Sequence, residues 1–370
     1  MTAIIGLTIG DAPALLGDVL VTSSGPSDTK LRIPTLENAN EYFGSTLYAH
    51  VPTLRQKVNI LSNKVIVSWS GSYLHAHSLL TEISDALTRG EGVETACNII
   101  RNMPESEKAK LSVIAFVRGP IKTTFIYNGA TNHFDSTIFS NLVGAGSGAQ
   151  DMASLIRRLE RSPLRVHEDL PDVSKAAMYG MLLGAQVAGL EYLTKENLLM
   201  SWGGIVETAV FNGGVATKVG EILYAFWECR KRGDEAVLQL LPTFIKQEYQ
   251  GDLLVTRTVS EKEGPRVVVI PPLLSQHKAG DRIGIRAPRL SYDWLCSCVV
   301  VHDEDRPIDV FAQVGRNLDT HPVSFVESQS IFPYKYSLTA SVQKGYVEQM
   351  FEFVRDVLAP EAKLSSAGTS

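Results

Sequence analysis

The chain has 370 residues, of which 44% are hydrophobic and 20% charged, an ordinary composition for a soluble globular protein. The formal net charge of −5 leaves no basic excess, so we expect no nucleic-acid partner. No stretch approaches the roughly 18 uninterrupted apolar residues of a membrane span, and the first residues lack a basic, apolar leader. We therefore expect a cytoplasmic protein with no membrane contact.

The first strands are expected in "TAIIGLTIG" and "DVLVTSS", joined by a turn at "DAPALLG". The polar segment 25–52 contains several prolines and indicates a long insertion or flap. Two short strands follow in "KVNILSNKVIVSWSGS". Helical spacing then predicts a helix, with a second helix in "VETACNIIRNM"; the apolar residues of the first are Leu74, Leu79, Leu80, Ile83 and Leu87.

The segments "LSVIAFVRG" and "KTTFIYNGA" predict a hairpin, and a glycine-rich loop, "VGAGSGAQD", follows. Helices are expected in "AQDMASLIRRLE" and over about 174–197. The second of these carries Gly180, Gly184, Ala185 and Gly189, small residues that allow close packing on a neighbour. "WGGIVETAVFNGG" predicts a strand, and "VGEILYAFWECR" a strand or short helix.

This order lacks the strict alternation of a parallel doubly wound fold, and favours two antiparallel sheets between helix layers. We expect a core over 1–230 and a β-rich region over 235–360 that ends in the helix "VQKGYVEQMFEFVRDVL". Residues 361–370 are expected to be a disordered tail. The four cysteines, Cys97, Cys229, Cys296 and Cys298, are too scattered for a disulfide framework or a metal site, so we expect reduced thiols, no metal and no cofactor.

The glycine-rich loop fits the dinucleotide-binding pattern G-x-G-x-x-A. That function also needs a following strand that ends in an acidic residue, about 20 residues on. Glu168 and Asp169 lie near that distance, but "RSPLRVHEDLPD" is too polar for a central strand. A nucleotide-dependent enzyme remains an alternative that saturable nucleotide binding would support. A serine hydrolase centred on Ser70 is another, although "SWSGS" lacks the first glycine of G-x-S-x-G.

From Thr2 to about Gly214, several segments resemble the proteasome β-subunit and its bacterial HslV-type relatives, within the N-terminal-nucleophile hydrolase superfamily. "TAIIGLTIGD" is similar to the opening strand of the family, and Lys57 and Gly71 have the family spacing of 14 residues. "VGAGSGAQ" resembles the G-S-G turn of the family, and "SWGGIVETAVF" its S-x-G-G strand start. The resemblance implies a four-layer αββα sandwich with a β-rich C-terminal extension.

The resemblance also implies a nucleophile at Thr2, exposed as the first residue when Met1 is removed. Its free α-amine, with a reference pKa of about 7.7–8.0, would then accept the Oγ proton. Lys57 would lie beside Thr2 and polarise Oγ with its positive charge. The alternatives are that Thr2 is an ordinary chain start and that Lys57 is an exposed strand residue.

Three further residues have implied roles. Gly71 would provide the N–H that binds the oxyanion, while Ser147 and Ser201 would support the amine and a bridging water through their hydroxyls. Serines at turns are also common local caps, which is the alternative for both. Trp69 would narrow the specificity pocket, or be a buried core residue.

The sequence departs from the family at two carboxylates. Where the family places one to hold the lysine, this chain has Ser23 or Ser24, with only Asp28 further along. Where the family has an aspartate before S-x-G-G, this chain has Leu198, with Glu196 as the nearest acid. Two functions therefore stay open.

One is a threonine-type N-terminal-nucleophile amidohydrolase, possibly a peptidase that acts on a peptide or protein. The other is a catalytically degenerate, proteasome-like structural or binding subunit. In both, the resemblance implies self-association into a ring or another homo-oligomer through the helix layers. Because residues 235–360 offer no chemical constellation, we expect them to be an assembly or regulatory region.

Overall fold

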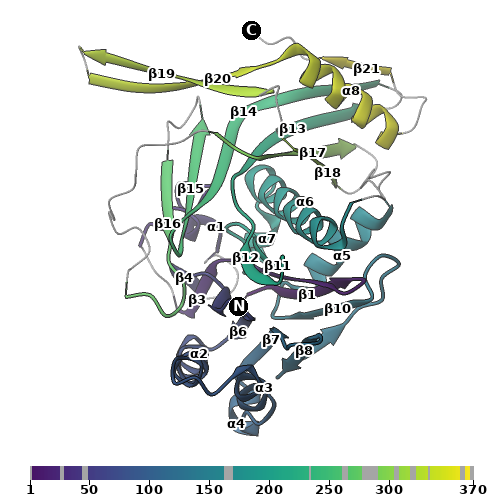
Figure 1. The fold of residues 1–370 in the computed structure, drawn as a ribbon. Coiled ribbons are helices and arrows are strands. Elements are labelled where there is room, and N and C mark those ends of the chain that lie inside the picture. Colours follow the sequence, from purple (N-terminus) through teal and green to yellow (C-terminus); the bar gives the residue numbers. More distant parts are fainter. Residues whose placement is uncertain are drawn as a thin grey trace.

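The computed structural model describes most of the chain: residues 2–25, 29–43, 49–161, 170–232, 235–260, 266–276, 291–303, 308–316, 322–331, 334–358 and 363–366. Asp28, Glu168 and Asp169, which the sequence analysis considered, lie outside these residues. Within them, the chain folds as a β-rich α/β protein with several antiparallel sheets (Figure 1).

Two antiparallel sheets pack face to face around the first strand. The six-stranded sheet has the order β12 (Val215–Lys218), β11 (Glu207–Asn212), β2 (Ala12–Gly17), β1 (Ile4–Ile9), β10 (Asn141–Ala145) and β9 (Thr131–His133). The four-stranded sheet has the order β5 (Val58–Ser62), β6 (Val65–Gly71), β7 (Leu111–Arg118) and β8 (Thr123–Asn128). Because β1 is covered on both faces, its run "IIGLTI" is buried throughout.

Helices cover the outer faces of this pair of sheets. α2 (Tyr73–Thr88) and α3 (Val93–Arg101) pack on the four-stranded sheet, and the short α4 (Glu105–Lys108) follows them. α5 (Ala149–Arg161) and α6 (Asp172–Leu193) pack on the six-stranded sheet, and α6 is followed by α7 (Glu196–Leu199). Of the predicted core face of α2, Leu79, Leu80 and Ile83 are buried, but Leu74 is 76% exposed, so that part of the prediction is wrong.

A third sheet covers the other side of α5 and α6 (Figure 1). Its order is β16 (Arg266–Ile270), β15 (Leu253–Ser260), β14 (Glu235–Gln250), β13 (Ile222–Arg232), β17 (Trp294–Asp303) and β18 (Asp309–Arg316), and β21 (Lys363–Ser366), from the predicted tail, pairs with β14. β13 with β17 and β14 with β21 are parallel pairs, and the other pairs of this sheet are antiparallel. α8 (Lys344–Leu358) packs against the outer face of this sheet.

The predicted four-layer αββα sandwich is therefore wrong for this chain. α6 lies between the six-stranded sheet and the third sheet and contacts both, so it is an inner layer and not an outer one. The C-terminal strands form part of the core, since β17 and β18 pack on α6. The family resemblance had instead implied that this helix layer meets another subunit. The small residues of α6 allow this packing: a Cβ at Gly180 would collide with Thr208 of β11, and one at Gly189 with Cys298 of β17.

Two small sheets complete the described structure. β3 (Leu20–Ser24) pairs with β4 (Ala49–Leu54) at the two ends of the segment predicted as a flap, which also contains α1 (Asn40–Phe43). β19 (Val323–Ile331) pairs with β20 (Tyr334–Val342). No helix among the described residues is long and apolar enough to cross a membrane.

The predicted pairing of the first two strands is also wrong. The partner of β1 is β2, which the sequence analysis treated as the turn "DAPALLG". Pro13 fits in this strand because β11, on the other side of β2, pairs only as far as Ala14. The missing N–H of Pro13 therefore breaks no ladder with β11. The second strand therefore ends at Gly17, and the residue that follows it is Asp18.

Candidate active site

Thr2 lies two residues before the start of β1, and its side chain contacts both a carboxylate and an ammonium group. Its Oγ1 donates a hydrogen bond of 2.6 Å to Asp18 Oδ1 and accepts one of 2.7 Å from Lys57 Nζ. Thr2 is only 2% exposed, and Asp18 and Lys57 are buried as well. The three side chains come from different strand ends, since Asp18 follows β2 and Lys57 precedes β5.

Asp18 supplies the carboxylate that the sequence analysis looked for at Ser23 or Ser24. Its Oδ1 accepts hydrogen bonds from Thr2 Oγ1 and from the backbone N–H of Ala3 at 3.1 Å, and it lies 3.8 Å from Lys57 Nζ. Ser23 and Ser24 are exposed on β3 and do not take this place. Asp18 could have been found as the first carboxylate after the second strand, had the end of that strand been predicted correctly.

Lys57 is fully enclosed. Its Nζ donates to Thr2 Oγ1 and, at 2.7 Å, to the carbonyl oxygen of Leu20, and it lies 4.6 Å from the centre of the Trp69 ring. Burial lowers the pKa of Lys57, while the carboxylates of Asp18 and Glu207 act in the opposite direction. Trp69, 1% exposed, is thus a buried wall beside the ammonium group.

The glycine-rich loop lies against the backbone of Thr2. The N–H of Gly148 donates to the carbonyl oxygen of Thr2 at 3.2 Å, and β10, directly before the loop, pairs with β1. Gly146 has φ = +92°, and a Cβ there would collide with the Thr2 carbonyl and lie 2.7 Å from Ser70 Oγ. The loop therefore needs its glycines for a close approach to Thr2. Ser147 itself is exposed.

A second turn reaches the site from behind Asp18. The N–H of Gly203 donates to Asp18 Oδ2 at 3.0 Å. Ser201, two residues earlier, is fully buried and has a left-handed backbone at φ = +69°. Its Oγ has no hydrogen-bond partner among the described residues. The turn thus brings a backbone donor to the Asp18 carboxylate, whereas the hydroxyl of Ser201 in the same turn has no partner among the described residues.

Glu191, on α6, is a buried acid that the sequence analysis missed. One of its oxygens accepts from Gly204 N–H and from Asn197 Nδ2, both at 2.7 Å, and the other accepts from the Thr35 hydroxyl. Burial raises the pKa of Glu191 to about 7, against the lowering effect of these hydrogen bonds. Glu191 is thus linked to Asp18 through the adjacent glycines of one turn. The periodicity of α6 gave no sign of it, because the residues around it are apolar.

Gly71 ends β6, with φ = +109°, and pairs with Leu111 of β7. The atoms nearest to a Cβ built there belong to Lys110 and Leu111. Among the predicted site residues, the structure thus joins Thr2 directly to Lys57, whereas no described contact joins Gly71 to Thr2. The role of Gly71 as the oxyanion donor stays a prediction.

No group of three or more potential metal ligands gathers among the residues that the structure describes. In comparisons with known proteins, no protein-family model and no curated protein matches this chain. What the site can do must therefore be argued from its own geometry. Chemically, a hydroxyl that contacts both a buried ammonium and a buried carboxylate can serve as a nucleophile once a base accepts its proton.

Proposed function

We propose that the protein is a threonine-type N-terminal-nucleophile amidohydrolase, with Thr2 as its nucleophile after removal of Met1. One observation carries the proposal: the buried Thr2 Oγ1 lies 2.7 Å from Lys57 Nζ and 2.6 Å from Asp18 Oδ1. A threonine placed only for packing has no need of a buried lysine and a buried aspartate, since desolvating two charges is costly.

In the proposed reaction, Thr2 Oγ attacks the carbonyl carbon of an amide, and the Oγ proton passes to the free α-amine of Thr2. The ammonium of Lys57 stabilises the negative charge that develops on Oγ. The tetrahedral intermediate then expels the amine, which takes the proton from the α-ammonium group, and an ester to Thr2 Oγ remains. Water hydrolyses the ester, which releases the acid and restores the hydroxyl.

Asp18 has a positioning role in this proposal. Its carboxylate binds Thr2 Oγ1 and the N–H of Ala3, so that it fixes the rotamer of Thr2 relative to β1. It also lies 3.8 Å from Lys57 Nζ, which favours the charged form of Lys57 against the effect of burial. The missing family carboxylate, which favoured a degenerate protein on sequence grounds, thus has a substitute.

The alternative is a catalytically degenerate structural or binding subunit. The burial of Thr2 favours it, because a side chain that is only 2% exposed is closed to substrate. Trp69, packed against Lys57, adds to this closure. The proposed reaction requires removal of Met1 because only then is the α-amine of Thr2 free.

Hydrolysis of a fluorogenic peptide-amide library tests the proposal, with protein whose N-terminal residue has been verified as Thr2. We expect turnover by the wild type, reduced turnover by Thr2→Ser, which keeps a hydroxyl, and none by Thr2→Ala. Turnover that persists in Thr2→Ala would reject Thr2 as the nucleophile. Absence of turnover on every peptide, together with an unreactive Thr2, would favour the structural subunit.

A further inference from the structure

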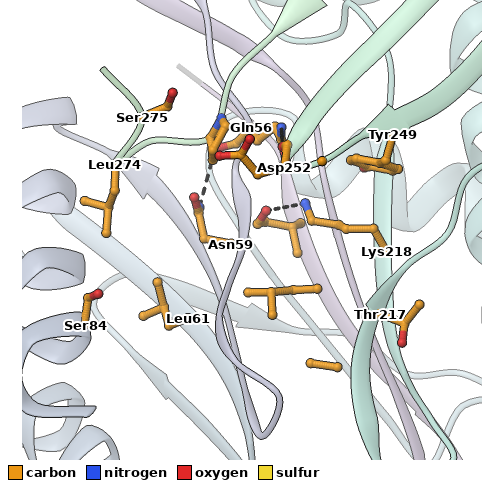
Figure 2. Close-up of a pocket in the computed structure, with 15 residues that line it drawn as sticks. Gln56, Asn59, Leu61, Ser84, Thr217, Lys218, Tyr249, Asp252, Leu274 and Ser275 are labelled. Carbon is orange, nitrogen blue, oxygen red and sulfur yellow. Dashed lines mark hydrogen bonds between the residues drawn. The ribbon is translucent and has the colours of Figure 1, made fainter. Parts of the chain in front are cut away.

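A cavity of about 580 Å³ lies beside β5, the strand that follows Lys57 (Figure 2). Its walls come from β5, β12, the turn between β14 and β15, the segment 272–275 and one residue of α2. Thr2 does not line it. Its size falls in the range of small-molecule sites, about 300–1,000 Å³. The proposed hydrolase chemistry makes no use of this cavity.

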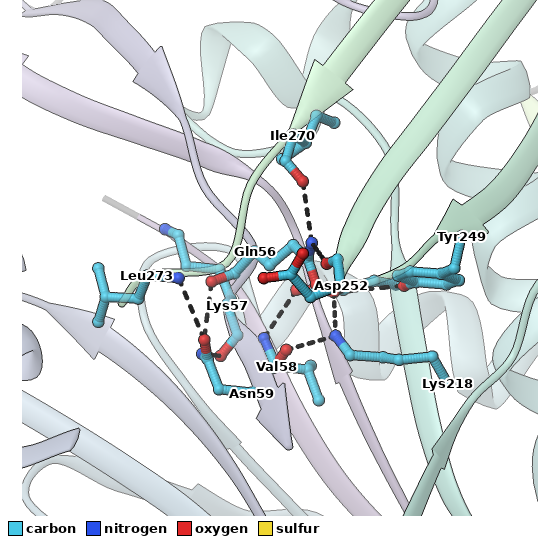
Figure 3. Close-up of polar contacts among 10 residues, drawn as sticks. Gln56, Lys57, Val58, Asn59, Lys218, Tyr249, Asp252, Ile270 and Leu273 are labelled. Carbon is cyan, nitrogen blue, oxygen red and sulfur yellow. Dashed lines mark hydrogen bonds and ion pairs between the residues drawn. The ribbon is translucent and has the colours of Figure 1, made fainter. Parts of the chain in front are cut away.

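Two polar side chains that line the cavity, Asn59 and Gln56, already hydrogen-bond to the backbone. Asn59 Oδ1 accepts from Leu273 N–H, and Gln56 Nε2 donates to the carbonyl oxygens of Asp252 and Ile270 at 2.7 and 2.9 Å (Figure 3). Side chains such as Leu61 and Leu274 then remain for contact with a ligand (Figure 2). An occupant would gain mainly from burying its own apolar surface.

Two residues that line the cavity are charged, Lys218 and Asp252, and they differ in what neutralises them. Lys218 Nζ is bound to the buried carboxylate of Glu207 and to the carbonyl oxygen of Val58, and lies 5.5 Å from the centre of the Tyr249 ring. Asp252 is exposed at the edge, and no cation among the described residues pairs with its carboxylate. The uncompensated charge of the cavity is therefore negative.

We propose that this cavity binds a small organic amine, with its apolar body between β5 and the 272–275 segment and its ammonium group at Asp252. Lys218 also lines the cavity, but the buried carboxylate of Glu207 neutralises its charge. The inference does not depend on the proposed hydrolase function, since it uses neither Thr2 nor Lys57.

Fluorescence titration with three matched dansyl compounds tests the proposal. Dansylcadaverine carries a cationic amine, its N-acetyl derivative is neutral, and dansyl-6-aminohexanoate is an anion of similar length. We expect saturable binding in the order cation, neutral, anion, with an enhanced, blue-shifted emission as the dansyl ring leaves water. The Thr2→Ala variant is expected to bind the cation as the wild type does, which separates this cavity from the active site.

Two substitutions block the cavity. Thr217→Trp at its exposed edge and Leu274→Trp inside it should each weaken dansylcadaverine at least tenfold, and Val215→Trp, on the same strand as Thr217 but outside the cavity, should not. Asp252→Asn should weaken the cation roughly three- to fivefold, as for an exposed ion pair, and leave the neutral compound unchanged. Unchanged affinity in Thr217→Trp would overturn the site even if Leu274→Trp fails to fold, and an anion that binds as tightly as the amine would overturn its ligand class.

Discussion

Replacing Asp18 with asparagine removes the one buried negative charge in contact with both Thr2 and Lys57. The side chain keeps its shape, but Lys57 Nζ loses a carboxylate at 3.8 Å. One of the two carboxylate oxygens of Asp18 is also replaced by an N–H₂ group. That group then faces either Thr2 Oγ1 and the N–H of Ala3, or the N–H of Gly203. All of these groups are buried, so water cannot replace the lost acceptor.

The cost follows from these two losses. Breaking a buried ion pair by removing one partner costs about 3–5 kcal/mol, and an unsatisfied buried donor costs about 1–3 kcal/mol. Because the two effects share the same groups and a lysine can lose its proton, we expect a net loss of roughly 4 kcal/mol. The pKa of Lys57 should also fall further, because two carboxylates raise it and that of Asp18 has the larger effect.

Urea unfolding followed by tryptophan fluorescence measures this change, with Asp85→Asn as the control because Asp85 is exposed on α2. We expect a lower midpoint at an unchanged slope for Asp18→Asn and no shift for the control. A loss for Asp18→Asn of less than about 1 kcal/mol, as for an exposed ion pair, would refute the reasoning.

Three other substitutions test separate parts of the site. Glu191→Gln should remove a pH dependence of the free energy of unfolding. The pKa of Glu191 is raised from 4.5 to about 7, so the folded state binds its proton more tightly and the wild type should lose up to about 3 kcal/mol relative to the variant as the pH rises through that interval. Plots of unfolding free energy against pH that run parallel for the two proteins from pH 4 to 8 would contradict this. Lys57→Met should abolish hydrolysis yet cost less stability in urea than Asp18→Asn, because the carboxylate keeps its other three donors; a larger loss would reverse the roles of the pair. Gly146→Ala should lower the thermal midpoint well beyond Gly90→Ala, since both have a positive φ but only Gly146 lies against Thr2; equal losses would show that the close approach is unimportant.

The sequence led to Thr2 and Lys57 but not to the carboxylate that lies beside both of them. The spacing of Lys57 and Gly71 made Lys57 a candidate neighbour of Thr2, and the contact is present at 2.7 Å. Asp18 was missed because Pro13 made β2 appear to be a turn. A proline is tolerated there only because of where β11 stops pairing, which depends on a strand about 200 residues away.

The layer order could not be derived from local patterns either. The small residues of α6 predicted close packing, and the contacts of Gly180 and Gly189 confirm it. They do not say how many sheets the helix meets, since a small residue allows approach on any side. That α6 contacts sheets on two faces depends on the fold of the C-terminal strands, whose sequences carry no motif that names their partner.

Glu191 shows the same limit for the site. A single acid in an apolar helix has many possible partners, and its actual ones, Thr35, Asn197 and Gly204, come from separate turns and loops. Its burial is therefore a property of the assembled fold. Such a buried acid cannot be predicted from a short sequence motif, because its hydrogen-bond donors lie in segments that meet only in the folded protein.

Intact-mass analysis with a peptide β-lactone, which acylates an activated hydroxyl, tests the central claim most directly. We predict that protein that begins at Thr2 gains the mass of one lactone, that peptide mapping places it on Thr2, and that Thr2→Ala and Lys57→Met remain unmodified. Protein that begins at Thr2 and stays unmodified at saturating lactone, or an adduct that persists in Thr2→Ala, would contradict the assignment of Thr2 as the nucleophile.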